Sequence, residues 1–464
     1  MNLSEVAAEW SGKASFNLLP ADVVEAVKLR ILDTIGVILA ARDTALVASV
    51  RASAAELYGE GDVRAIGFPH GTSAAGAALI NGTAALALEF DDSHLESGIH
   101  PSCSVVSACL PTATRLGLSG QRLIEAVTVG NELTCRLGLV APGAFHRHGF
   151  HPTGIFGTFG ATYALAKCRS LDRDRTVNAV GISGSMAAAS MASWEDGTAA
   201  KSLHAGLAAA AAEASVALAA HGVSGPAVIF DGRFGFFRAH VQDTGNMLPF
   251  DEFGQRLASS WEVRNIVPKA YPCGHYIQPF VEAGLILQRQ HGFSAEQVVS
   301  IRCSVADYTI PLVCEPVVEK VRPKSAFQAR FSLQHCLADA IVSGRFDRSS
   351  LADAALRDPR IAALAGRVAY EAEPVFSDRR RLGGSVRIQL ADGRDVAHRI
   401  EHMRGMTQNP MSSADVIRKF EDNARDALRR EAVGSTIESI LRLEKIENVS
   451  AILRPLSDEE NLRR

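Results

Sequence analysis

The sequence predicts a mainly α-helical protein with one large helical domain and one smaller α+β domain. Its 464 residues exceed the roughly 250–300 at which one hydrophobic core stops growing, so we expect two domains. Hydrophobic residues make up 47% of the chain but aromatic residues only 6%, which leaves Ala, Leu, Val and Ile to fill the interior and favours helix-on-helix packing. Helical apolar spacing dominates up to about residue 260, and strand spacing appears only after Pro268.

The helices of the first domain follow from apolar residues three and four positions apart. The segment 21–41 carries a broad apolar face and is entered through Pro20 and Asp22, both typical of a helix start. Several other segments are rich in alanine, which costs little side-chain entropy and lets helices approach closely. We expect further helices at residues 72–89, 104–116, 120–139, 157–168, 174–190 and 202–220.

The second domain, expected at residues 265–403, mixes helical and alternating spacing. In order, the pattern predicts a helix at 278–291, a strand at 298–305, a helix at 325–343, and strands at 385–390 and 394–400. The last two strands flank Ala391-Asp392-Gly393, and Asp-Gly supplies the positive φ angles of a tight turn, so we expect a hairpin there. Helical spacing then returns at 412–430 and near 437–444.

Charge and cysteine content narrow the class of protein. Lys and Arg number 48 against 51 Asp and Glu, a net charge of -3, which gives no overall basic field for nucleic acid or anionic lipid. The N-terminus has no secretion-signal pattern, and Glu213 interrupts the alanine-rich run 205–220, which argues against a membrane span. We therefore expect a reduced, cytoplasmic setting, since no Cys-x-x-Cys pair is present. The eight cysteines are at positions 103, 109, 135, 168, 273, 303, 314 and 336.

The first candidate functional segment runs from Glu89 to Pro101. Glu89-Phe90-Asp91-Asp92-Ser93-His94 ends a predicted helix, and Ile99-His100-Pro101 follows after a glycine-containing loop. Carboxylates at the C-terminal end of a helix oppose its macrodipole, so they need some other reason to be there. A polar helix end is the alternative interpretation.

The second segment is His146-Arg147-His148-Gly149-Phe150-His151-Pro152, ahead of a helix expected to begin near Ile155. It could supply an acid/base histidine and a helix N-terminus that binds carboxylate. A metal site is the alternative, but no His-x-x-x-His or cysteine spacing on one helix face accompanies the histidines. We interpret His146 and His148 as solvated loop residues and predict a functional role for His151.

The third segment, Lys201-Ser202-Leu203-His204-Ala205-Gly206, opens an alanine-rich helix. Lys201 and His204 are three residues apart and share one helix face, so both can reach one ligand. The alternative is an ordinary exposed lysine. Nearby Gly181-Ile182-Ser183-Gly184-Ser185 does not match a dinucleotide-binding fingerprint and follows no strand, so we expect no nicotinamide or flavin cofactor.

Two more segments fall in the second domain. Pro268-Lys269-Ala270-Tyr271-Pro272-Cys273-Gly274-His275 lies where the helical pattern gives way to α+β, the kind of place where clefts between domains form. A proline-stiffened linker is the alternative. Ala329-Arg330-Phe331-Ser332-Leu333-Gln334-His335 could equally be an amphipathic helix with one polar stripe.

Together these segments resemble the MmgE/PrpD family, which includes 2-methylcitrate dehydratase, cis-aconitate decarboxylase and iminodisuccinate epimerase. The likeness runs almost from end to end, and the order of the motifs carries it. The motifs are Leu32-Asp33-Thr34-Ile35-Gly36, Asn81-Gly82, Phe90-Asp91-Asp92 with His100-Pro101, His151-Pro152-Thr153, Lys201-Ser202-Leu203-His204-Ala205-Gly206, Lys269-Ala270-Tyr271-Pro272-Cys273, and Ala329-Arg330-Phe331-Ser332.

The resemblance implies a large all-helical domain built from both ends of the chain, residues 1–264 completed by 404–464. It also implies an inserted α+β lid at 265–403 and a homodimer with the site between the domains. The family's decarboxylases carry Asp where Glu89 stands and Tyr where His335 stands, which weakens any inference about the substrate. By motif position the family's pocket maps onto Glu89, Ser93, His100, His151, Lys201, Lys269 and His335.

Roles follow from the chemistry of these side chains. We expect Lys201, Lys269 and His100 to hold substrate carboxylates through charge-assisted hydrogen bonds. We expect His151 to exchange a proton, because an ordinary histidine pKa near 6.5 populates both forms at neutral pH. The four residues predicted to be catalytic are thus His100, His151, Lys201 and Lys269. The residues predicted to bind substrate are Glu89, Ser93, His204, His275 and His335.

The function that follows is a cofactor-independent lyase, a dehydratase or decarboxylase acting next to a carboxylate of a small di- or tricarboxylic acid. An epimerase of an amino- or imino-dicarboxylate such as iminodisuccinate is the second hypothesis. A noncatalytic helical scaffold is a third, although the sequence lacks the fixed repeat of roughly 34–45 residues that it predicts. A metal-dependent hydrolase built on the histidine loop is a fourth.

Overall fold

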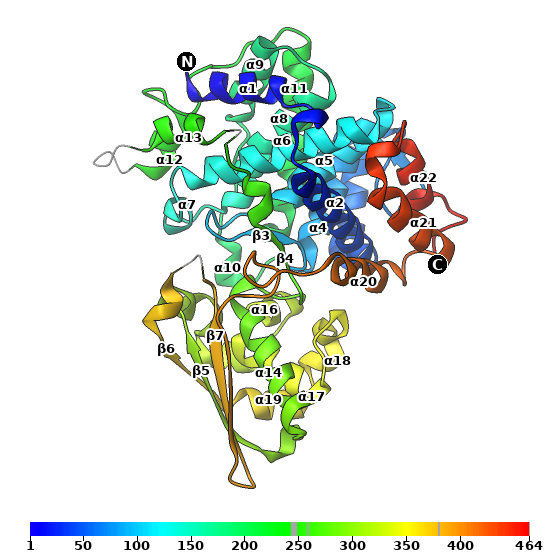
Figure 1. Cartoon of the computed structure of the whole chain (residues 1–464). Helices are drawn as coiled ribbons and strands as arrows, with labels where there is room; N and C mark the ends of the chain where they lie inside the picture. Colours follow the sequence, from blue (N-terminus) through cyan, green and yellow to red (C-terminus); the bar gives the residue numbers. More distant parts are fainter. Residues whose placement is uncertain (243–247, 258, 379–380, 464) are drawn as a thin grey trace. The chain divides into compact units, whose positions relative to one another are not determined.

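The structure, a computed structural model, describes residues 1–242, 248–257, 259–378 and 381–463 (Figure 1). The chain divides into two compact units, a larger unit of Met1–Pro268 with Ser412–Arg464 and a smaller unit of Lys269–Met411. The chain therefore leaves the larger unit after Pro268 and returns at Ser412. The sequence-based boundaries at 264/265 and 403/404 both lie earlier. The first differs because residues 266–268 form a strand that pairs within the larger unit.

Helices make up most of the larger unit, and the predicted mainly α fold is confirmed. Their bounds are α1 (Leu3–Lys13), α2 (Ala21–Ala41), α3 (Ala45–Tyr58), α4 (Ala74–Ala87), α5 (Pro101–Arg115), α6 (Gly120–Leu139), α7 (Ala144–Arg147), α8 (Pro152–Cys168), α9 (Arg173–Ser183), α10 (Ser193–Asp196), α11 (Ala200–Ala220), α12 (Phe236–Val241), α13 (Phe250–Arg256), α20 (Ser413–Ala424), α21 (Arg430–Leu441) and α22 (Ser450–Ser457).

The predicted helices of this unit occur, several with shifted boundaries, and two of the shifts have local reasons. Helix α8 begins at Pro152 rather than at residue 157, because proline fits the first helical position, where no amide hydrogen is needed. Helix α9 ends at Ser183 rather than at residue 190, where Gly184 follows as its C-cap. Glycine has a low helix propensity, which favours an end at this point.

The larger unit also contains two short antiparallel strand pairs, so the expectation that it is all-helical was wrong in detail. Strand β1 (Glu60–Arg64) pairs with β2 (Gly71–Thr72), and β3 (Asp92–His94) pairs with β4 (Ile266–Pro268). Strands of two to five residues are too short to show the alternation by which strands are recognised in a sequence. The second pair joins segments 172 residues or more apart, since His94 faces Ile266 and Asp92 faces Pro268.

Two glycines set the close packing of α4 on α11. A Cβ atom added to Gly82 would lie 2.7 Å from the Cα of Gly206, and one added to Gly206 would lie 2.3 Å from the carbonyl oxygen of Leu79. Neither position accepts a side chain without moving backbone. The contact fixes the C-terminal end of α4 beside the N-terminal end of α11, which is where Glu89 and Lys201 lie.

The returning C-terminal segment completes the core of the larger unit. Helix α20 packs against α2, and the two lie side by side in Figure 1 although they are far apart in the sequence. Phe420 is fully buried, and Gly36 leaves room for its ring, because a Cβ at position 36 would lie 3.0 Å from the ring. Residues 412–464 are thus part of the structure that holds the first helices.

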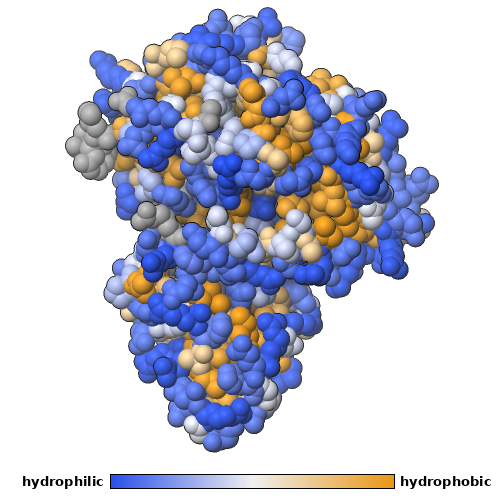
Figure 2. Space-filling view, in the orientation of Figure 1, coloured by the Kyte–Doolittle hydropathy of each residue, from blue (hydrophilic) through white to orange (hydrophobic). Residues whose placement is uncertain are grey.

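Helix α11 (Ala200–Ala220) is long and apolar enough by composition to cross a membrane. It nevertheless contacts α4, α8 and α9 within the larger unit. It also carries buried charges, since Glu213 forms an ion pair with Arg169 at 2.7 Å. On the face seen in Figure 2, apolar side chains form separate patches surrounded by polar ones. These features are those of a core helix.

The smaller unit is an α+β structure around a four-stranded sheet with the strand order β6-β5-β7-β8. Strand β5 is parallel to β6 and antiparallel to β7, and β7 and β8 form the predicted hairpin, whose Gly393 has φ +89°. Helix α14 contacts both strands of the hairpin. The strands are β5 (Val298–Val305), β6 (Val368–Ala372), β7 (Gly384–Leu390) and β8 (Asp395–Ile400).

The helix predicted at 325–343 is two helices, because Ser332 is extended and caps the second one. Its Oγ accepts a hydrogen bond from the backbone N–H of His335. A serine at an N-cap stabilises a new helix start at the expense of continuing the old one. The helices of this unit are α14 (Gln278–His291), α15 (Val317–Val321), α16 (Ala326–Arg330), α17 (Leu333–Ser343), α18 (Asp353–Leu356) and α19 (Pro359–Ala365).

Candidate active site

Three helices of the larger unit begin at the candidate site. His100 is the N-cap of α5 and His151 is the N-cap of α8, and each is followed by a proline at the first helical position. Proline disfavours the helical conformation in the residue before it, so each His-Pro pair places its histidine just outside the helix. Lys201 lies in the first turn of α11. The positive ends of three helix dipoles therefore accompany these side chains.

The structure brings together six of the nine predicted site residues in the larger unit. Hydrogen bonds, an ion pair and a close approach of two rings link them, and all six side chains are buried. None is more than 7% exposed, so the low local dielectric constant strengthens the charge interactions among them. The six are Glu89, Ser93, His100, His151, Lys201 and His204.

His100 is held by acceptors on one side of its ring. Its Nδ1 lies 2.8 Å from Oδ2 of Asp91, 2.8 Å from the carbonyl oxygen of Asp92 and 3.0 Å from Oγ of Ser93. A carboxylate and a carbonyl can only accept, so Nδ1 carries a proton. The backbone N–H of His100 donates to Oγ1 of Thr153 at 3.1 Å, which ties the ring to the start of α8. The arrangement leaves Nε2 as the atom that can exchange a proton.

Glu89 forms a buried ion pair with Lys201, from Oε1 to Nζ. Both side chains are 2% exposed. The backbone of Glu89 has φ +52°, a left-handed conformation that is uncommon outside glycine and that often occurs at functional sites. This conformation follows directly on the end of α4. The close contact of α4 and α11 described above holds the two partners within reach of each other.

His151 lies between the cationic and the imidazole parts of the site. Its Nδ1 is 2.9 Å from Nδ1 of His204, and its ring centre is 6.1 Å from that of His100. In an Nδ1-to-Nδ1 hydrogen bond one ring donates and the other accepts, so at least one of the two rings is neutral. Gly154 permits this approach, since a Cβ there would lie 3.1 Å from Cβ of His204.

The surroundings of His151 favour its neutral form. Burial and then the charge of Lys201 lower the pKa of His151 well below its usual range. The same two causes lower the pKa of His204 to about 4. The expectation that both forms of His151 are populated near neutral pH was therefore wrong. The sequence could not show the reason, because both the burial and the neighbouring ammonium depend on tertiary contacts.

Asp91 and Thr153 belong to the site but were not among the predicted site residues. Both lie inside the motifs that sequence reasoning singled out, Asp91 next to Asp92 and Thr153 two residues after His151. Asp91 and Asp92 stand nine and eight residues before His100, and the geometry of the intervening loop decides which carboxylate pairs with it. Asp92 instead accepts from the backbone N–H of Ser102 at 3.3 Å, and burial raises its pKa to about 6.

His94 is buried beside the site in a separate hydrogen-bond network. Its Nε2 lies 3.2 Å from Oε2 of Glu262, and this hydrogen bond is the main cause that lowers the pKa of Glu262 to about 2. The backbone N–H groups of Glu262 and Val263 each donate to Glu132 at 3.1 Å. Glu132 in turn pairs with Arg136 at 2.6 Å. This network fixes the strand pair that carries Asp92 and Ser93.

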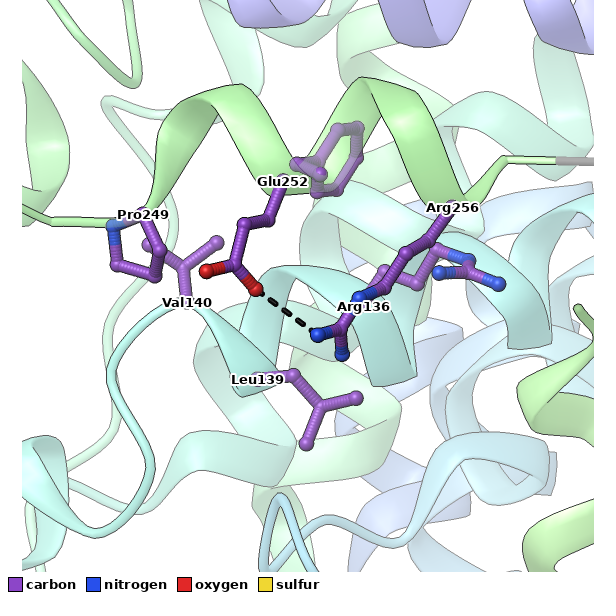
Figure 3. A pocket seen from close by; sticks show the side chains of 7 residues that line it. Arg136, Leu139, Val140, Pro249, Glu252 and Arg256 are labelled. Carbon is purple, nitrogen blue, oxygen red and sulfur yellow. Dashed lines mark hydrogen bonds and ion pairs between the residues drawn. The ribbon is translucent and has the colours of Figure 1, made fainter. Parts of the chain in front are cut away.

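A small pocket in the larger unit is not the candidate site (Figure 3). Its volume is about 40 Å³, close to that of one water molecule, and far below the several hundred Å³ of ligand sites. Arg136 lines it, together with an ion pair between Glu252 and Arg256 at 2.9 Å. Two wider depressions of about 600 and 920 Å³ contain none of the predicted site residues.

The other histidines of the second motif lie apart from His151. His148 is exposed, as predicted for a solvated residue, whereas His146 is half-buried and lies against Gly98. In the part of the chain that the structure describes, no three His, Cys, Asp or Glu side chains are grouped so that they could hold a metal ion. All eight cysteines are buried and free of disulfide bonds.

The remaining three predicted residues lie in the smaller unit. Lys269 is fully buried and directly follows β4, and the next two backbone N–H groups donate to Oε1 of Gln278 at 3.1 and 3.0 Å. His275 begins a short 3-10 helix, with its ring 4.0 Å from that of Tyr276. His335 lies in the first turn of α17, and burial lowers its pKa to about 4.

Two segments of the smaller unit that carry these residues adjoin each other. The backbone N–H of Gly274 donates to the carbonyl oxygen of Arg330 at 2.9 Å, next to His275. A Cβ on Gly274 would lie 3.1 Å from the ring of Phe331, so glycine allows this close approach. The fourth and fifth motifs of the sequence thus meet within one unit.

Comparison with known proteins supports the resemblance to the MmgE/PrpD family. The model of the MmgE/PrpD N-terminal domain matches residues 5–247, and that of the MmgE/PrpD C-terminal domain matches residues 271–445. A cis-aconitate decarboxylase-like protein, oryM, from Aspergillus oryzae is 25% identical over 99% of this chain and 98% of its own length. Cis-aconitate decarboxylases of Mus musculus and Homo sapiens are each 26% identical over 82% and 81% of this chain, and 78% of theirs.

Proposed function

The chain belongs to the MmgE/PrpD family, and from that premise we propose that it is a lyase that decarboxylates a cis-aconitate-like tricarboxylate by acid/base chemistry. Membership of the family and likeness to cis-aconitate decarboxylases along most of the chain support an enzyme of the lyase kind, acting on aconitate or methylcitrate-type acids. The finer choice of decarboxylation rests on the names of those relatives and on the chemistry of the buried cluster.

One observation carries the proposal, namely the opposite surroundings of two adjacent imidazoles. The rings of His100 and His151 are 6.1 Å apart, but His100 faces the carboxylate of Asp91 and His151 faces Lys201 and His204. Two titratable groups with opposed environments are the usual arrangement of an acid and a base in one site.

The cationic side of the cluster suits a substrate with several carboxylates. Lys201 supplies a buried ammonium group, and it lies with His100 and His151 at the N-terminal ends of three helices. Helix N-termini favour anions, and charge-assisted hydrogen bonds in a dry site are about twice as strong as neutral ones. Glu89 orients Lys201 through its ion pair, and it occupies the position where the family's decarboxylases carry Asp.

Proton transfer is assigned to the histidines. Decarboxylation breaks the carbon–carbon bond to the departing carboxyl group, which leaves as carbon dioxide. The electron pair of the broken bond forms a new double bond, and the original double bond gives its electrons to its far carbon, which accepts one proton. His100 is the proton donor through Nε2, because the Asp91 carboxylate stabilises its charged form. His151 is neutral and acts as the hydrogen-bonding or accepting partner near the developing negative charge.

The direct test is turnover by the purified protein. We expect cis-aconitate to lose one carbon as carbon dioxide, and NMR of the product measures this loss. 2-Methylcitrate and iminodisuccinate are tested in the same way. A matched control is Lys13→Met, which changes an exposed lysine that pairs with Glu9. If no acid in this panel is changed, and Lys201→Ala binds each of them as the unaltered protein does, the proposal is wrong. If the protein instead dehydrates or epimerises one of these acids, decarboxylation is the wrong reaction and another reaction of the family takes its place.

We further propose that the enzyme needs no metal or organic cofactor and that it acts as a homodimer. For the first point, we expect turnover to survive exhaustive treatment with a chelator. We also expect elemental analysis to find less than one equivalent of bound metal. Light scattering after size-exclusion chromatography checks the second, with a mass near twice the 49.4 kDa of one chain expected. Stoichiometric zinc or iron would contradict the first point.

A further inference from the structure

A buried lysine from the returning C-terminal segment reaches the backbone of the candidate site. Lys419 lies in α20 and is 7% exposed. Its Nζ donates to the carbonyl oxygen of Phe90 at 2.7 Å and lies 4.1 Å from the centre of the Phe90 ring. The two residues are 329 positions apart in the sequence.

Phe90 separates the two carboxylates that orient the site. Glu89, before it, pairs with Lys201, and Asp91, after it, pairs with His100. The peptide group whose oxygen Lys419 holds is the one that joins Phe90 to Asp91. A displacement of this peptide would move Asp91 directly and would disturb Glu89 through Phe90, and the backbone of Glu89 is already held in an uncommon left-handed conformation.

The ammonium group also belongs to a buried charge cluster beneath the site. Lys419 pairs with Asp33 of α2 at 2.7 Å and interacts with the charges of Asp91 and of Arg30. Arg30 donates to the carbonyl oxygen of Ile266 in β4 at 2.9 Å and interacts with Asp92. Two cations therefore hold the two sides of the β3–β4 region, Lys419 the side leading into β3 and Arg30 the side of β4.

We propose that Lys419 is a positioning residue for the reaction, which holds the Phe90 peptide so that Glu89 and Asp91 keep Lys201 and His100 in their working orientation. This inference rests on the proposed function, and it concerns a residue outside all the sequence motifs. A hydrogen bond to the carbonyl is the feature that separates this role from simple neutralisation of Asp33.

Two single variants and their combination separate these roles. Lys419→Met removes the hydrogen bond and leaves Asp33 as an uncompensated buried charge, so we expect a lower Tm and a kcat about 30-fold lower, with KM changed less than about threefold. Asp33→Asn keeps the lysine on the Phe90 carbonyl, so we expect a kcat within about threefold of the unaltered protein.

The double variant Lys419→Met with Asp33→Asn decides between the roles. It contains no unpaired partner of this ion pair, so we expect its Tm to recover most of the loss while its kcat stays about 30-fold low. A kcat restored with the Tm would overturn the proposal, and so would an Asp33→Asn variant as impaired as Lys419→Met. If Lys419→Met alone does not fold, the double variant carries the test.

Lys28→Met is the matched control, since Lys28 is a buried lysine of α2 whose ion pairs are with Glu25 and Glu444 rather than with a residue of the candidate site. We expect it to lower Tm without the selective loss of kcat.

A second readout does not depend on turnover. In protein labelled with ¹⁵N at histidine, we expect the imidazole signals of His100 to change in Lys419→Met and to stay unchanged in Asp33→Asn and Lys28→Met. If the unaltered protein turns over no acid in the panel, the proposed reaction fails while these spectra still test the position of Asp91. Unchanged His100 signals in Lys419→Met would show that Lys419 does not position the peptide that joins Phe90 to Asp91.

Discussion

His100 and His151 begin from the same local sequence and end in opposite electrostatic surroundings. Both precede a proline, both cap a helix and both are buried. The ring of His100 rests on the carboxylate of Asp91 and the carbonyl of Asp92, which stabilise a proton on Nδ1. The ring of His151 faces His204 and the charge of Lys201, which oppose a second proton.

The difference teaches that a helix N-terminus alone does not decide the charge of its capping histidine. The dipole disfavours a cation at both positions, but at His100 a buried carboxylate oxygen lies 2.8 Å from Nδ1. At His151 the burial, the dipole and the ammonium group act in the same direction. Two residues of one type can thus divide the roles of acid and base within one site.

Asp91→Asn is the substitution that should abolish this difference most directly. The amide cannot stabilise a charged His100, although the Asp92 carbonyl still fixes the tautomer. We expect kcat to fall by about 100-fold, within the range typical of a general acid or base, and the fold to be kept. Steady-state kinetics with the turned-over acid measure it, and circular dichroism controls for folding. A loss below about fivefold would mean that His100 is not the acid.

Changing Lys201 tests the other half of the comparison. Lys201→Met combined with Glu89→Gln removes the ammonium without leaving its carboxylate partner charged and unpaired. We expect kcat/KM to fall by about 30-fold, since a charge-assisted contact is worth roughly 2 kcal/mol. The pKa of His151 should rise as well, which NMR titration of the imidazole measures. An unchanged pKa would show that burial alone keeps His151 neutral.

A further prediction concerns the pH dependence of stability, which does not require turnover. The folded pKa of His204 is lowered to about 4, below the ordinary 6.5, so between these values the unfolded chain binds more protons. Stability should therefore be fully present above about pH 6.5 and decline as the pH falls toward 4, with up to roughly 3 kcal/mol from this residue.

Other groups titrate in the same window, including Asp92 with its raised pKa, so the comparison of His204→Gln with the unaltered protein isolates the contribution. We expect the variant to lose less free energy of unfolding between pH 7 and pH 4.5, measured by urea denaturation. Equal losses in the two proteins would show that His204 is protonated normally in the fold.

Much of the local structure could be predicted because its causes are local. Proline and the apolar spacing placed α2 at residues 21–41, and Asp392-Gly393 placed the turn of the β7–β8 hairpin. The short strands β3 and β4 could not be predicted, since they are stabilised by pairing with each other across the chain. Six predicted site residues meet in the larger unit, but Asp91, Thr153 and Lys419, which contact His100 and the peptide after Phe90, were not predicted.

The sequence by itself determined a mainly helical fold, the two His-Pro helix starts and the residue types gathered at the candidate site, because spacing, proline geometry and composition act through neighbours along the chain. Only the tertiary structure decided that Asp91 rather than Asp92 pairs with His100, that His151 is neutral, and that Lys419 reaches Phe90 from 329 residues away. Desolvation and Coulomb interactions depend on distance in space, and the fold alone sets those distances.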